Sequence, residues 1–87
     1  MPEHKKYVKG FNGSLDQLAK NVGIMQYNYT SSFIESLAND IAKQADADLM
    51  RGRGDLSSRL YETANELYQA KEKMDLAWKI CKPYMKG

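Results

Sequence analysis

Residues 55–81, DLSSRLYETANELYQAKEKMDLAWKIC, form the longest uninterrupted periodic segment of the chain and carry its only tryptophan. Two sets of residues recur every seven positions, the second four residues after the first: Leu60, Leu67, Met74 and Cys81, then Ala64, Lys71, Trp78 and Met85. This spacing predicts one long helix with an apolar seam that only Lys71 interrupts. A helix of about 40 Å with a single apolar seam needs partner helices along its whole length.

A second helix is predicted over residues 32–50. Ser32 and Glu35 have the spacing of a capping box, and the apolar stripe that follows is rich in alanine, which lets another helix approach closely. The segment RGRGD at 51–55 makes a sharp break, with Asp55 as the expected N-cap of the long helix. A connection of about four residues makes two helices antiparallel neighbours, so we expect a helical hairpin.

A short helix is predicted before the hairpin. Ser14 and Gln17 form a capping box, apolar residues follow at helical spacing as far as Val22, and Gly23 is a typical C-terminal stop. Such a helix of about two turns is marginal alone and must pack on something. We therefore expect an all-α fold, with one helical domain over residues 14–87 and a flexible arm over residues 1–13.

Self-association is expected from the size of the chain and from its tyrosines. A chain of 87 residues, 43% hydrophobic, folds but buries a modest fraction of its surface. Tyr61 and Tyr68 flank the seam and widen its apolar face beyond what one antiparallel helix covers. Either the short helix covers them or a second subunit does. We favour a homodimer that forms a four-helix bundle, with Tyr61, Tyr68 and Trp78 at the interface.

The sequence lacks the residues that catalysis, metal binding or membrane insertion would need. The single histidine, His4, lies in the arm, and the single cysteine, Cys81, lies on the seam, so no nucleophilic catalytic set and no zinc-binding set can be assembled. We expect neither an enzyme nor a cofactor or metal site. No apolar run approaches the roughly 20 residues that cross a bilayer, and the basic N-terminus has no apolar segment behind it, so we expect a cytoplasmic protein without membrane contact.

The aromatic and basic residues least needed by a core are candidates for binding a protein partner: Met25, Tyr27, Tyr29, Arg51 and Arg53. The patch around residues 24–29 is either such a surface or a plug at one end of the bundle. The function we expect is that of a small, non-enzymatic interaction or regulatory protein that binds a protein partner and itself.

An alternative function is DNA binding. The segment LDQLAKNVGI, residues 15–24, resembles the opening half of many bacterial helix-turn-helix domains. That resemblance implies a dimeric regulator using residues 15–34, with a recognition helix that starts within about three residues and carries polar or basic side chains. The next basic residue in the sequence is Lys43, so phosphate contacts would fall to Lys20 and the lysines of the arm.

Overall fold

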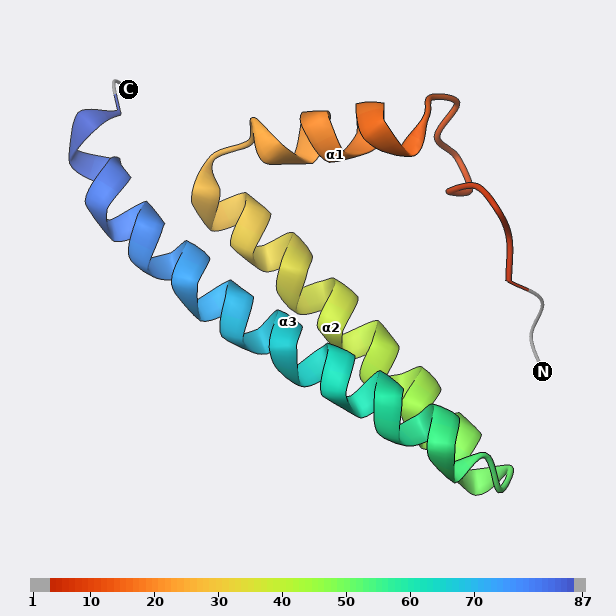
Figure 1. Cartoon of the computed structure of the whole chain (residues 1–87). Helices are drawn as coiled ribbons and strands as arrows, with labels where there is room; N and C mark the ends of the chain where they lie inside the picture. The colour runs from red at the N-terminus through yellow and green to blue at the C-terminus, as the bar shows by residue number, and fades with distance from the viewer. Residues whose placement is uncertain (1–3, 86–87) are drawn as a thin grey trace.

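The structure is a computed structural model that describes residues 4–85 and consists of helices only (Figure 1). Its elements are α1 (Leu15–Gly23), α2 (Tyr27–Met50), α3 (Gly54–Cys81) and a turn of 3-10 helix, η1 (Lys82–Tyr84). Helices α2 and α3 lie side by side as a long antiparallel hairpin, and α1 projects from its open end (Figure 1). The predicted all-α hairpin with a short N-terminal helix is confirmed. Predictions for residues 1–3 and 86–87 lie outside the described residues.

The hairpin turns at residues 51–53, as the glycines predicted. Gly52 has a positive φ of 78°, a backbone conformation that residues with a Cβ rarely adopt. The backbone N–H of Arg53 donates to the Asp48 carbonyl at 2.9 Å, and its guanidinium pairs with the Asp48 carboxylate at 3.2 Å. Helix α3 begins at Gly54, so Asp55 lies in its first turn and the predicted N-cap is wrong by two residues.

The predicted start of α2 is also wrong. The helix begins at Tyr27, five residues before the expected cap at Ser32. The Ser32 hydroxyl donates to the Asn28 carbonyl one turn earlier at 3.1 Å, and the Glu35 carboxylate lies 3.7 Å from the Lys71 ammonium. Neither side chain therefore caps a helix end. A serine hydroxyl can bond the carbonyl of the preceding turn, which allows the helix to continue through Ser32.

Small residues make the contact line between α2 and α3. Five side chains at seven-residue spacing are at most 3% exposed: Ser31, Ala38 and Ala45 on α2, with Ser57 and Ala64 on α3. Because these side chains are small, the backbones approach closely enough for the Ser57 hydroxyl to donate to the Ala45 carbonyl at 2.9 Å. The larger residues of the predicted seam, such as Leu60 and Leu67, therefore lie beside the contact line and are only half-buried.

Helix α1 has the predicted capping box. The Ser14 N–H donates to Oε1 of Gln17 at 2.8 Å, and the Gln17 N–H donates to the Ser14 hydroxyl at 3.1 Å. At its other end, the Thr30 hydroxyl donates to the Val22 carbonyl at 3.0 Å. Among the described helices α1 contacts α2 and not α3, so it does not cover the α3 tyrosines.

Candidate interaction surfaces

The hairpin has two faces, one on each side of its contact line. In an α-helix, residues three and four positions after a contact residue lie on opposite sides of it. On α3, Tyr61 and Tyr68 come four residues after the contact residues Ser57 and Ala64, while Leu60 and Leu67 come three after them. The tyrosines and the leucines therefore line different faces, which we call the polar face and the apolar face.

The polar face is joined across the two helices by side-chain hydrogen bonds. The Tyr68 hydroxyl donates to Oδ1 of Asn39 at 2.5 Å, and the Tyr61 hydroxyl donates to the Asp46 carboxylate. The bond to Asp46 raises the pKa of Tyr61. Both tyrosines predicted at a dimer interface thus have hydrogen-bond partners within their own chain.

Lys71 occupies a contact-line position and points its charge to the polar face. Its ammonium lies 2.7 Å from the Asp75 carboxylate and 3.7 Å from that of Glu35. The Ser31 hydroxyl donates to the same Asp75 at 2.5 Å. The hydrogen bonds from Lys71 and Ser31 lower the pKa of Asp75, and Asp75 raises the pKa of Lys71. The positive charge that interrupted the predicted seam is thereby paired with Asp75 on its own helix and with Glu35 on α2.

Among residues 4–85, the apolar face has no comparable partner. It consists of three residues from each helix: Ile34, Leu37 and Ile41 on α2, with Leu60, Leu67 and Met74 on α3. Leu37 is 40% exposed, and the other five are half-buried. The sequence predicts a dimer interface at Tyr61, Tyr68 and Trp78, and it did not single out this face. The sequence does contain a sign of this face: Leu60 and Leu67 each follow a small residue by three positions, which places them beside the helix contact.

An apolar hollow separates α1 from the start of α2. It has a volume of about 410 Å³ and is lined by residues from both helices: Leu15, Leu18, Ala19, Val22, Gly23, Thr30, Phe33 and Ile34. Ile34 belongs both to this hollow and to the apolar face of the hairpin. The two apolar surfaces are therefore continuous.

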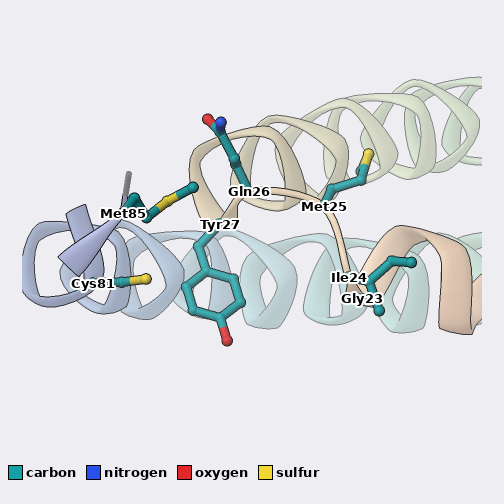
Figure 2. Close-up of a pocket in the computed structure, with 7 residues that line it drawn as sticks. All are labelled: Gly23, Ile24, Met25, Gln26, Tyr27, Cys81 and Met85. Carbon is teal, nitrogen blue, oxygen red and sulfur yellow. The ribbon is translucent and has the colours of Figure 1, made fainter. Parts of the chain in front are cut away.

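The open end of the hairpin has a second hollow, of about 360 Å³, between the α1–α2 connection and the end of α3. In Figure 2, Cys81 and Met85 lie on one side of Tyr27 and Met25 lies on the other, and all four residues line this hollow. The predicted partner residues Met25 and Tyr27 thus share a site, and Tyr29 is exposed in the first turn of α2.

The predicted arginines lie elsewhere, at the tip of the hairpin. Helix α2 separates Arg51 and Arg53 from the open end by about 35 Å at 1.5 Å per residue. Arg51 is exposed, and Arg53 pairs with Asp48. The predicted partner patch is therefore two separate surfaces. Trp78, predicted at the dimer interface, is half-buried in line with Ala64 and Lys71.

The segment resembling a helix-turn-helix has a three-residue connection between α1 and α2, residues 24–26. The first four turns of α2 carry no Lys or Arg, and Thr30 and Ser31 are buried. DNA binding by residues 15–34 stays a prediction. A gel shift that weakens steeply with added salt is its test, because phosphate contacts release counterions.

These features define the chain as an all-α hairpin protein with exposed apolar surfaces. Comparison with protein-family models, with curated proteins and with solved structures finds no match to it. Within residues 4–85, no helix has the length and apolar character needed to cross a membrane. Across the same residues, no three histidine, cysteine or acidic side chains gather as a possible metal site.

Proposed function

We propose that this chain is a small, non-enzymatic helical interaction protein that self-associates through its apolar face and binds a protein partner at its open end. One observation carries the proposal. Among residues 4–85 the buried hydrophobic residues are three alanines, Ala38, Ala45 and Ala64, while most larger apolar side chains stay exposed or half-buried. A core this small contributes little hydrophobic stabilisation, so covering the apolar face is the main way to gain more.

The surface area of the chain supports a second copy as that cover. A compact monomer of 9.9 kDa is expected to expose about 5,200 Å², and this chain exposes 7089 Å². The segment before α1, residues 4–14, is almost entirely exposed and accounts for part of the surplus of about 1,900 Å². A stable interface needs only about 800 Å² from each partner, so the surplus is large enough for a dimer. Two hairpins joined by their apolar faces would form a four-helix bundle.

The open end suits a protein partner with acidic side chains. Its hollow combines Tyr27 with Met25 and Met85, and flexible thioethers fit varied apolar side chains. Lys79 and Lys82 lie on either side of Cys81, and residues 76–85 contain no acidic residue. An amphipathic segment with acidic residues beside its apolar ones therefore complements this end of the molecule.

Self-association is tested with two neighbouring residues of α2. Leu37→Asp places a charge on the apolar face, where the single chain leaves the side chain 40% exposed, so the hairpin should still fold. Ser36→Asp places the same charge on the adjacent, exposed position outside that face. In sedimentation equilibrium we expect a wild-type dimer, a dissociation constant raised about 100-fold by Leu37→Asp, and no change with Ser36→Asp. A wild type that stays monomeric at all concentrations contradicts the proposal.

Partner binding is tested by comparing the two ends of the hairpin. Affinity capture with quantitative mass spectrometry is run on wild type, on a Met25→Ser/Tyr27→Ser variant and on an Arg51→Ser variant. We expect proteins captured by wild type to be lost with the open-end variant and kept with the tip variant. If the captured proteins were lost with the Arg51→Ser variant alone, the partner would bind at the tip of the hairpin and not at its open end.

A further inference from the structure

Helix α1 presents an apolar stripe that its own chain leaves largely open. Leu15, Leu18 and Val22 line the hollow opposite Phe33 and Ile34. Leu15 is 65% exposed and Phe33 is 43% exposed. In Figure 1, α1 projects away from the hairpin instead of lying along it. An amphipathic helix held in this way exposes the face that would normally be buried.

Hydrogen bonds form at both ends of α1, and the one at its last turn joins it to α2. The capping box at Ser14 and Gln17 satisfies two backbone donors at its start. The Thr30 hydroxyl holds its last turn on α2 through the Val22 carbonyl. A helix of nine residues is marginal alone, so a single hydrogen bond to α2 leaves the apolar stripe of α1 in need of further packing.

From this geometry we infer that α1 is part of the self-association surface, and that the hollow between α1 and α2 receives the hairpin of a second copy. The inference rests on the proposed self-association. Ile34 joins the hollow to the apolar face, so a hairpin seated on that face extends into the hollow without a break. The lining carries no charged residue, which suits the leucines and isoleucines of the apolar face in the other copy. In a two-fold dimer, one contact covers this hollow in both chains.

The first test compares two residues of α1. Leu15→Asp removes an exposed leucine and adds an acid to the first turn, where the helix dipole favours it, so α1 is preserved. We expect the dissociation constant of the dimer to rise at least about tenfold, as for one buried leucine. The control, Asn21→Asp, makes the same charge change near the end of α1, where it is less favourable for the helix. Equal effects of the two substitutions, or no effect of Leu15→Asp, would overturn the inference.

The second test locates α1 in the dimer directly. A spin label is attached to the new cysteine of an Asp16→Cys/Cys81→Ser chain. This chain is mixed with wild-type protein that is labelled with ¹⁵N and carries no spin label. We expect broadened amide signals from Leu37, Ile41 and their neighbours in the ¹⁵N copy. A dimer without that broadening overturns the inference and leaves the self-association intact. A chain that remains monomeric in sedimentation overturns both.

Discussion

The two faces of the hairpin differ in how far the chain satisfies them by itself. On the polar face, hydroxyl and charged groups of α3 find acceptors and counter-charges on α2, as Tyr68 does with Asn39. On the apolar face, Leu37 and its neighbours remain half-covered, and nothing in residues 4–85 completes their burial. The polar face therefore serves to align α2 with α3, and the apolar face is the better candidate for an intermolecular contact.

The largest effect is expected from Leu67→Ala on the apolar face. If a second copy buries Leu67, the substitution should lower the free energy of unfolding by about 2–5 kcal/mol. If Leu67 stays half-exposed in a monomer, the loss should be about 1 kcal/mol. Urea unfolding at two protein concentrations distinguishes the cases, because the unfolding midpoint of a dimer rises with concentration. Leu76→Ala, at an exposed position of α3, is the control and should cost less.

Much of the fold could be predicted from periodicity and turn residues. The seven-residue spacing in α3 and the glycines near Gly52 specify a hairpin because few other arrangements bury one long apolar seam. Periodicity could not predict which residues of this apolar stripe contact the other helix. Leucines and small residues both recur every seven positions. The helices approach most closely where the small residues Ser57 and Ala64 form the contact, and Leu60 lies beside it. That choice depends on the partner helix, whose own contact residues are also small.

The close contact line is tested by Ala45→Leu. Ala45 is fully buried and its carbonyl accepts the Ser57 hydroxyl, so a larger side chain has no space without separating the helices. We expect the substitution to lower the free energy of unfolding by about 1–3 kcal/mol. Ala70→Leu at an exposed position is the matched control and should change it by less than about 0.5 kcal/mol. A tolerated Ala45→Leu would mean that the helices pack through the larger residues, as the sequence predicted.

A smaller effect is expected from Tyr68→Phe on the polar face. The substitution removes the hydroxyl bonded to Asn39 and keeps the ring, so it should cost about 0.5–1.5 kcal/mol at most. A double-mutant cycle with Asn39→Ala measures the coupling between the two side chains. The dissociation constant of the dimer should stay unchanged. If it rises tenfold or more, the interface lies on the tyrosine side, and the contrast between the faces is reversed.

The candidate site was harder to predict than the fold. The residues chosen from the sequence were aromatic or basic side chains and one methionine, and the structure divides them between the open end, the tip, the polar face and, for Trp78, the line of Ala64 and Lys71. A tyrosine hydroxyl can bond within its chain or across an interface, and composition does not distinguish these uses. Tyr61 and Tyr68 find acceptors on α2 because the register places Asp46 and Asn39 opposite them.

The smallest expected effect is a change in the titration of Asp75. Hydrogen bonds from Lys71 and Ser31 lower its pKa in the folded chain, so folding is stabilised above the unfolded pKa of about 4. This stabilisation is lost as the pH falls through the lower pKa of the folded state. Lys71→Met removes the larger cause and should raise the Asp75 pKa more than Ser31→Ala does, as measured by carboxyl ¹³C chemical shifts. An Asp75 pKa unchanged by Ser31→Ala would mean that the Ser31 hydroxyl does not join α2 to Asp75 across the hairpin, and one unchanged by Lys71→Met would mean that the Lys71–Asp75 pair along α3 is not formed.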